Sequence, residues 1–170
     1  MLCVIRTMGS LPFTGLMQVY ERSNREQGAR EWPWEPENRQ LALAEEAFYT
    51  YLSTCFFQTP EAACYLWLEQ DQPVSALRCE PYRDGMILTA LETDPKEEGK
   101  GYATRLLSHT LKALQEKGIQ RVYVHIHRSN IASQRVHQHC GFVKTSQGGR
   151  LLDGSYSPEL DTYRFDCMPE

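Results

Sequence analysis

The stretch Leu91-Glu92-Thr93-Asp94-Pro95-Lys96-Glu97-Glu98-Gly99-Lys100-Gly101-Tyr102-Ala103-Thr104 decides the fold of this chain. It begins as the end of an apolar run, 86–93, which is typical of a strand. Asp94-Pro95 ends that strand, because proline has no N–H to donate to a sheet. A polar turn with two glycines follows, and an amphipathic helix begins near Ala103. This order of elements can hold a phosphate, since the first turn of a helix has unpaired N–H groups at the positive end of its dipole.

The glycine turn alone leaves two interpretations open. In the first interpretation, the turn only joins a strand to a helix. It lacks the third glycine of a dinucleotide-binding fingerprint, and Gly99-Lys100-Gly101 differs from the Gly-Lys-Ser/Thr that ends a P-loop. A second motif further along the chain favours the ligand-binding interpretation.

Composition limits the class of protein. The chain has 170 residues, enough for one domain with a full core, so we expect a single domain over 1–170. The formal net charge of −4 argues against binding nucleic acid and is compatible with a cationic substrate such as an amine. The N-terminal apolar stretch is too short for a secretory signal, and no run approaches the length of a membrane span. We therefore expect a cytoplasmic protein that does not bind a membrane.

The six cysteines favour the same compartment. None forms a Cys-x-x-Cys pair or stands with a histidine in zinc-finger spacing. Several lie inside apolar runs, where free thiols behave as small hydrophobic side chains. The sequence thus predicts reduced cysteines without structural disulfides.

The order of predicted elements defines the fold class. We expect strands at 2–8, 63–69, 74–80, 86–93, 121–128, 142–146 and 162–166, helices at 14–27, 38–57, 103–117 and 131–140, and loops at 29–38 and 148–159. Gly28, Gly118 and Gly141 are read as the ends of three of these helices. The three strands from 63 to 93 form an antiparallel meander, and helices connect the later strands. The class is therefore α+β, or α/β with a mixed sheet.

The second motif, Asn130-Ile131-Ala132-Ser133-Gln134-Arg135-Val136-His137-Gln138-His139-Cys140-Gly141-Phe142, directly follows a strand. Together with the glycine turn it resembles the GNAT superfamily of acetyl-CoA-dependent N-acetyltransferases. The family's first motif, Gln/Arg-x-x-Gly-x-Gly/Ala, is matched at Gly101 and Ala103, with Glu98 in the place of the usual Gln or Arg. The second, Asn-x-x-Ala/Ser-x-x-Leu/Val-Tyr-x-x-x-Gly-Phe, is matched at Asn130, Ser133, Val136, Gly141 and Phe142, with His137 in the place of the tyrosine.

The resemblance implies a GNAT-like fold over the whole chain. Its central, mostly antiparallel sheet is splayed between the fourth and fifth strands and flanked by helices. Acetyl-CoA is then the cosubstrate, and its pantetheine lies in the splay. The residues that the resemblance implies for cofactor binding are the strand segment Leu91, Glu92 and Thr93, the amides of Gly99, Lys100, Gly101, Tyr102, Ala103 and Thr104, and the second-motif residues Asn130 and Ser133. A carboxylate at Glu98 is unfavourable beside a pyrophosphate unless it points away.

Two residues are candidates for proton transfer. Glu92 is the one carboxylate at the end of the fourth strand, and it can accept the amine proton directly or through water; the alternative is a surface residue in an ordinary ion pair. The resemblance places His137 at the position of the family's tyrosine, the presumed acid that protonates the departing thiolate. An unshifted histidine is about a quarter protonated at pH 7, and imidazolium is a stronger acid than phenol. The alternative is a histidine that caps backbone or packs beside Phe142.

Other features are less specific. His125 and His127 alternate on one strand face, but no third ligand is evident, so we expect no metal. The Trp32-Pro33-Trp34 loop is either a wall of the acceptor pocket or a plug of the core. The acceptor pocket is expected from segments around 20–40, 82–84 and 147–160.

Two functions remain open at this point. One is an N-acetyltransferase acting on a primary amine of a small molecule or peptide, as a monomer or homodimer. The other is a catalytically silent acyl-CoA-binding module of the same fold.

Overall fold

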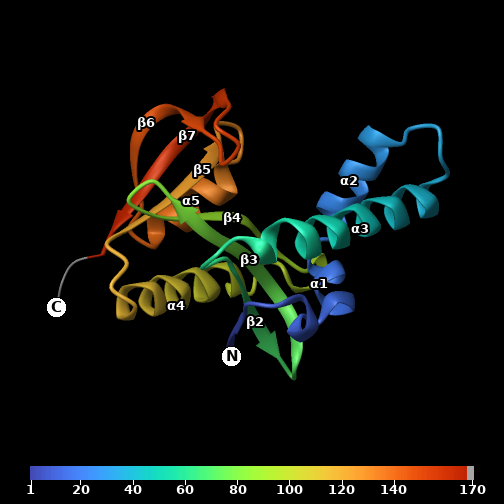
Figure 1. The fold of residues 1–170 in the computed structure, drawn as a ribbon, viewed down its shortest axis with the longest axis horizontal. Coiled ribbons are helices and arrows are strands. Elements are labelled where there is room, and N and C mark those ends of the chain that lie inside the picture. The colour runs from blue at the N-terminus through green and yellow to red at the C-terminus, as the bar shows by residue number, and fades with distance from the viewer. Residues whose placement is uncertain (168–170) are drawn as a thin grey trace.

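A seven-stranded mixed sheet forms the centre of the computed structural model, which describes residues 1–167 (Figure 1). The strand order is β1-β2-β3-β4-β5-β7-β6, and every neighbouring pair is antiparallel except the parallel pair β4–β5. The strands are β1 (Leu2–Ile5), β2 (Ala63–Glu69), β3 (Gln72–Tyr82), β4 (Gly85–Thr93), β5 (Arg121–His127), β6 (Val143–Arg150) and β7 (Tyr156–Asp166). The predicted α+β class with a mixed sheet is confirmed.

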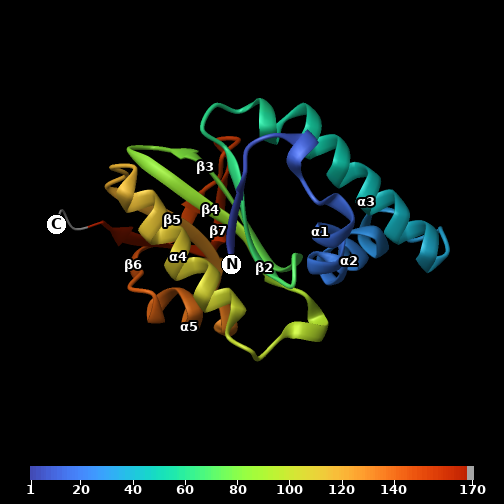
Figure 2. The ribbon, with the colours of Figure 1, turned by 90° about the horizontal axis from the view of Figure 1, so that it is seen from below.

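Five α-helices cover the two faces of the sheet. Figure 2 shows α4 and α5 on one face and α1, α2 and α3 on the other. Their bounds are α1 (Phe13–Val19), α2 (Glu21–Glu31), α3 (Glu37–Thr54), α4 (Tyr102–Glu116) and α5 (Ile131–His139), and three 3₁₀ turns lie at Met8–Ser10, Phe56–Gln58 and Pro95–Glu97. No helix in the described part of the chain is long and apolar enough to cross a bilayer.

Each face of the sheet has its own core because strand side chains alternate. On the α4 face, Leu77 and Cys79 of β3 pack with the buried stripe of α4, formed by Leu106, Leu107, Thr110, Leu111 and Leu114. On the other face, Ala76 packs with Leu16 of α1 and Leu52 of α3. Burying one leucine side chain contributes about 1.5–3 kcal/mol, so the α4 stripe accounts for much of what holds this helix to the sheet.

β4 and β5 pair over only three residues each. Met86, Ile87 and Leu88 pair with Val122, Tyr123 and Val124, and the strands then part. A β-bulge interrupts β4 opposite Leu77, where Ala90 adopts a φ of 51°. The Tyr20 hydroxyl donates a hydrogen bond of 2.8 Å to the Ala90 carbonyl and stabilises the bulge. The splay expected between the fourth and fifth strands is therefore present.

The N-terminal part of the chain corrects four predictions. The expected helix at 14–27 is two helices that meet at Tyr20, and the expected strand at 2–8 ends at Ile5. Gly28 lies inside α2 and does not end it. A Cβ at Gly28 would lie 2.5 Å from the carbonyl oxygen of Gln40, so this glycine permits the close approach of α2 and α3. The expected loop at 29–38 shortens to residues 32–36, because both helices extend into it.

The C-terminal hairpin corrects another prediction. The expected loop at 148–159 is mostly strand, and only residues 151–155 separate β6 from β7. The register shifts at Gly148 and Gly149, so the glycines act as bulges within β6 and do not end it. Elsewhere α3 ends at Thr54, three residues before the expected end. All six cysteines are free thiols, as predicted.

Candidate active site

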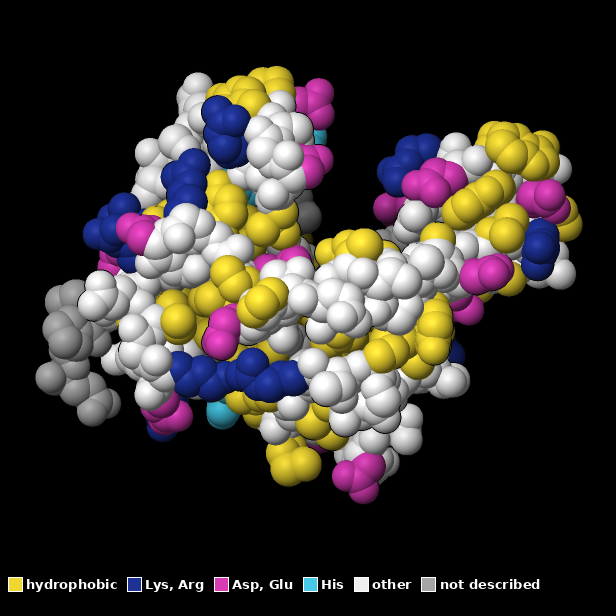
Figure 3. Space-filling model, in the orientation of Figure 1, with side chains coloured by type: hydrophobic (Ala, Val, Ile, Leu, Met, Phe, Trp, Pro, Cys, Tyr) yellow, Lys and Arg dark blue, Asp and Glu magenta, His cyan; other side chains and the backbone are white. Residues whose placement is uncertain are grey.

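Three adjoining cavities open where β4 and β5 part. The largest, here called the cleft cavity, has a volume of about 670 Å³. Figure 3 shows the surface hollowed between the lobe of β5, β6 and β7 and the arm of α2 and α3. The cleft cavity is lined by β4 residues Ile87 to Glu92, β5 residues Val124 to His127, Arg22, Ser23 and Glu26 of α2, Asn130, Ser133 and His137 near α5, and Leu151, Leu152, Asp153 and Leu160. Two of the three segments expected around the acceptor, 20–40 and 147–160, thus contribute to it; 82–84 does not.

The second cavity, here called the glycine-loop cavity, lies at the start of α4 and has a volume of about 590 Å³. Gly99 and Gly101 adopt φ angles of 78° and 79°, and a Cβ at either would meet nothing within 4 Å. Gly101 is the N-cap of α4, and no side chain caps the first-turn amides. These amides are left for an anion, which a helix N-terminus attracts. The residues expected to bind the cofactor all line this cavity, with the exception of Lys100.

Three charged residues of the turn, Glu97, Glu98 and Lys100, form ion pairs. The Lys100 ammonium lies 2.6 Å from the Glu97 carboxylate, and Lys100 does not line the cavity. Glu98 forms an ion pair of 2.8 Å with Arg22 of α2. This pair resolves the difficulty of a carboxylate beside a pyrophosphate, because Arg22 neutralises it. Sequence reasoning missed Arg22, since nothing in the sequence relates α2 to a turn so far along the chain.

Asn130 has a structural role that leaves part of its side chain free for a ligand. Its Oδ1 accepts a hydrogen bond of 3.0 Å from the Ser133 amide, which caps α5. Asn130 lines both the cleft cavity and the glycine-loop cavity, and its side-chain NH2 group has two N–H donors.

Glu92 lines all three cavities and lies in the part of β4 that no longer pairs with β5. Burial raises the pKa of its carboxyl to about 7, against the lowering influence of the Ser23 hydroxyl and the positive charges of Arg78 and Arg22. A carboxyl with this pKa exchanges a proton readily near neutral pH. The alternative of a surface residue in an ordinary ion pair does not fit this burial.

His137 lines the cleft cavity but is 1% exposed. Its Nδ1 lies 2.8 Å from the Ser133 carbonyl, so Nδ1 carries the proton and donates it there. The ring meets Phe142 edge to face, with 5.2 Å between centroids. Burial lowers the pKa of His137, so the expectation of an unshifted histidine, a quarter protonated at pH 7, is wrong. Nε2 is buried without a hydrogen-bond partner in the described part of the chain.

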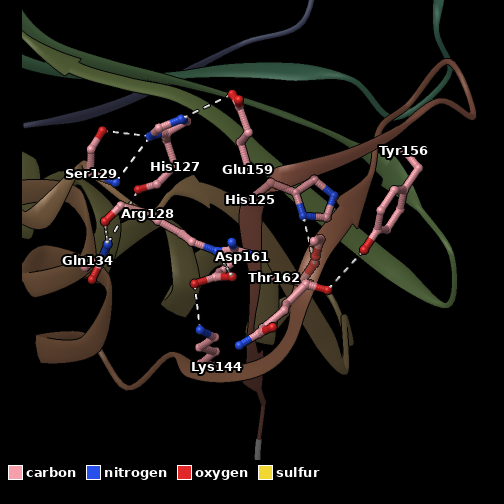
Figure 4. A network of polar contacts seen from close by, with 12 residues as sticks. His125, His127, Arg128, Ser129, Gln134, Lys144, Tyr156, Glu159, Asp161 and Thr162 are labelled. Atoms are coloured by element: carbon pink, nitrogen blue, oxygen red, sulfur yellow. Dashed lines mark hydrogen bonds and ion pairs between the residues drawn. The ribbon is translucent and has the colours of Figure 1, made fainter.

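The two histidines of β5 belong to a polar network that fixes the β5–α5 turn (Figure 4). His125 Nδ1 contacts the Thr162 hydroxyl at 3.1 Å, and its Nε2 contacts the Arg150 carbonyl at 3.0 Å. His127 contacts the Ser129 hydroxyl at 2.7 Å and lies 3.5 Å from the Glu159 carboxylate. No group of three metal-ligating side chains occurs within residues 1–167. These histidines hold β7 and the turn that carries Asn130.

The tryptophan loop lies far from the cavities. Trp34 is 74% exposed, and Trp32 is half-buried. Figure 1 shows the α2–α3 connection at the far right end of the molecule, away from β4 and β5. Neither tryptophan lines any of the three cavities, so the structure does not bring this loop to the expected acceptor pocket.

Comparison with known proteins defines the class. Residues 16–142 match the acetyltransferase (GNAT) family, and the chain belongs to that family. A curated relative, the [ribosomal protein bS18]-alanine N-acetyltransferase of Haemophilus ducreyi, is 28% identical over 108 residues, which cover 62% of this chain and 74% of the relative.

Solved structures share the fold at low identity. The ribosomal-protein-S18-alanine N-acetyltransferase from Escherichia coli has a TM-score of 0.64 at 14% identity and covers 100% of this chain and 96% of its own. The PaiA N-acetyltransferase from Thermoplasma acidophilum, solved in complex with coenzyme A, has a TM-score of 0.66 at 12% identity, covering 98% and 99%.

Family membership settles the choice between the two functions left open by the sequence. The protein is an N-acetyltransferase that takes its acetyl group from acetyl-CoA and transfers it to an amine. The silent-module alternative is set aside.

Proposed function

We propose that Glu92 is the general base that prepares a primary amine for acetylation in the cleft cavity. The single observation that carries this proposal is the position of Glu92, which lines all three cavities with a pKa of about 7. A primary ammonium must lose a proton before its nitrogen can attack. A carboxylate at the mouth of the cleft attracts the ammonium and takes that proton, directly or through water.

The chain also offers the groups that would bind the cosubstrate. The uncapped amides of α4 suit the pyrophosphate, since they combine free N–H donors with the positive end of a helix dipole. The edge of β4 that faces β5 suits the pantetheine arm at Leu91 and Thr93, because β5 does not pair with β4 beyond Leu88. The Asn130 amide is a further donor beside that edge. When bound, acetyl-CoA supplies the activated acetyl thioester.

The reaction also needs a group that donates a proton to the departing thiolate. The new N–C bond forms as the C–S bond breaks, and the ammonium loses two protons while the thiolate gains one. Glu92 takes the first proton, and solvent receives the net one. We propose His137 as the donor to the thiolate, acting through the charged form that its burial disfavours. Its contacts with Ser133 and Phe142 define the competing role, that of a packed residue which orders α5.

Thiol release from acetyl-CoA, measured with a panel of primary amines, tests the proposed function. Calorimetric titration with acetyl-CoA in the absence of an amine tests cosubstrate binding separately. The panel should include small amines and peptides that begin with alanine, because the Haemophilus relative is named for an alanine of a ribosomal protein. The assignment of Glu92 would be overturned if no amine increased the rate of thiol release, or if the rate were unchanged in Glu92→Gln.

We further propose that residues 1–170 form a single acetyltransferase domain that acts as a monomer or homodimer in the cytoplasm. Six free thiols support a reducing compartment. The net charge of −4 supports the expectation that it does not bind nucleic acid. Light scattering of the purified protein checks the oligomeric state.

A further inference from the structure

A third cavity, here called the α2–α3 cavity, lies between those two helices and the sheet and has a volume of about 490 Å³. It shares Ser23, Glu26, Ala90 and Glu92 with the cleft cavity. A group held in it therefore reaches the proposed base from the side of the sheet covered by α2 and α3. This volume lies within the usual range of about 300–1,000 Å³ for small-molecule sites.

The far wall of the α2–α3 cavity carries a cation. Arg78 of β3 lines this cavity but not the other two. Its guanidinium carbon lies 5.3 Å from the centre of the Phe48 ring and 5.2 Å from that of Tyr51, both on α3. A guanidinium packed on aromatic faces keeps its N–H groups directed outward in its own plane, where they can bind a carboxylate.

Arg78 has no partner of its own for these N–H groups. Within residues 1–167 its side chain makes no hydrogen bond and no ion pair, and its Nε is buried and unsatisfied. Glu80, two residues along β3, is a buried carboxyl whose pKa burial raises and Arg78 lowers, but it does not reach ion-pair distance. Arg78 is half-buried, and a partly desolvated cation without a bonded anion is costly, so this site is suited to an anion from a ligand.

The charges of the α2–α3 cavity are arranged from one end to the other. Glu26 and Glu92 stand at the end shared with the cleft cavity, and two cations, Arg78 and Arg30, line the rest; Arg30 lies 3.6 Å from the Glu31 carboxylate, whereas Arg78 has no such partner. Glu92 pairs across the sheet with Ala76, two residues before Arg78, so the two side chains are diagonal neighbours on one face. Diagonal neighbours lie about 7–8 Å apart, with the bulge between them here. Both side chains are long enough to reach the two ends of one small molecule.

We propose that the acceptor carries a carboxylate close to its amine, and that Arg78 binds this carboxylate while Glu92 faces the amine. This inference rests on the proposed function and names the acceptor class. Free amino acids have this chemistry, and so does a peptide with an acidic side chain next to its N-terminus. Arg78 is thus a specificity-determining residue of the acceptor site.

The test compares carboxylates with their neutral esters. A panel of α-amino acids, each paired with its methyl ester, is assayed for thiol release from acetyl-CoA. A peptide amide with glutamate at its second position is compared with the same peptide carrying glutamine, which separates the two sources of the carboxylate. The parent should favour the carboxylate roughly ten- to hundredfold in kcat/KM, as expected for hydrogen bonds to a charged group.

Variants of Arg78 isolate its contribution. Arg78→Met keeps the aliphatic contact with Phe48 and Tyr51 and should abolish the preference for the carboxylate over its ester. The two substrates are compared as a ratio within each variant, because Arg78 also lowers the pKa of Glu92 and its loss changes the rate for both. Arg78→Lys should retain part of the preference. Arg39→Gln, which removes an equal charge from an exposed position of α3 outside the cavities, should leave it intact. Equal losses for acid and ester in Arg78→Met would overturn the proposal, as would a parent that accepts both equally.

A binding measurement gives a second readout that does not depend on turnover. Calorimetric titration of the parent with an N-acetyl amino acid, in the presence of coenzyme A, should show binding that its methyl ester lacks. If no carboxylate binds, the inference fails even where simple amines are acetylated. If the carboxylate binds but Glu92→Gln is fully active, the assignment of the base fails and that of Arg78 stands. The parent comparison alone decides the matter should Arg78→Met not fold.

Discussion

Glu92→Gln is the substitution that bears most directly on the mechanism. It keeps the shape of the side chain and removes its ability to take a proton. A positioned general base contributes about 10²–10⁴-fold to rate, so the substitution should lower kcat/KM for the amine by about that factor. In the parent, kcat/KM should rise with pH through about 7, where the carboxyl ionises, and this limb should be missing in the variant.

The same substitution should stabilise the protein at alkaline pH. The ordinary pKa of this carboxyl is 4.5, and burial raises it to about 7, so the folded state holds the proton more tightly than the unfolded state. The stability that this proton contributes is present below pH 4.5 and is lost as the pH rises through about 7. Once the group is ionised, the cost to the folded state is about 3 kcal/mol.

Urea unfolding at two pH values measures this difference. Glu92→Gln should be more stable than the parent at pH 8 by about 3 kcal/mol and nearly equal to it at pH 4, where the parent carboxyl is protonated in both the folded and the unfolded state. Glu45→Gln is the matched control for activity. Burial also raises the pKa of Glu45, but this residue lies on α3 outside the three cavities, so its substitution should leave kcat/KM unchanged. Unchanged kcat/KM in Glu92→Gln, or a loss of stability at pH 8, would refute the reasoning.

Three further outcomes are expected. Gly101→Glu should abolish calorimetric binding of acetyl-CoA, whereas Gly118→Glu, at the same φ of 79° in equally open surroundings at the other end of α4, should bind like the parent; equal affinities for the two variants would move the site elsewhere. His137→Phe should keep the contact with Phe142 and lower kcat by about tenfold or more with little change in acetyl-CoA affinity, and an unchanged kcat would leave His137 a packing role. Iodoacetamide at pH 8, followed by mass spectrometry, should modify the exposed Cys55 first and spare Cys64 and Cys79 until unfolding, because burial raises the pKa of both thiols to about 12.

The sequence was most informative where a single local pattern determined the structure. The strand 63–69 and the buried stripe of α4 were predicted closely, because alternation and helical periodicity follow directly from which face is buried. Gly28 was predicted to end a helix and the loop 148–159 to begin at Gly148, and both predictions are wrong. The small size of these glycines serves a close contact with Gln40 in one case and a bulge in the other, and both depend on a partner distant in the sequence.

The parts of the site that could not be predicted depend on tertiary contacts. Arg22 and Arg78 are ordinary charged residues in a helix and a strand, and only folding brings them to Glu98 and Glu92. Glu92 was chosen for its place at the end of a strand, but its pKa of about 7 depends on burial that no local pattern encodes. The lowered pKa of His137 has the same origin.

The short pairing of β4 with β5 gives the sheet four free edges in place of two. β1 and β6 end the sheet at its rims, while β4 beyond Leu88 and β5 beyond Val124 are additional edges inside it. A free edge is a template for a strand from another chain, and proteins usually shield or shorten it. Here the inner edges are set back in a cleft between α2 and the β6–β7 connection. Acetyl-CoA bound in that cleft would cover both inner edges, and it should therefore make the protein less prone to aggregate.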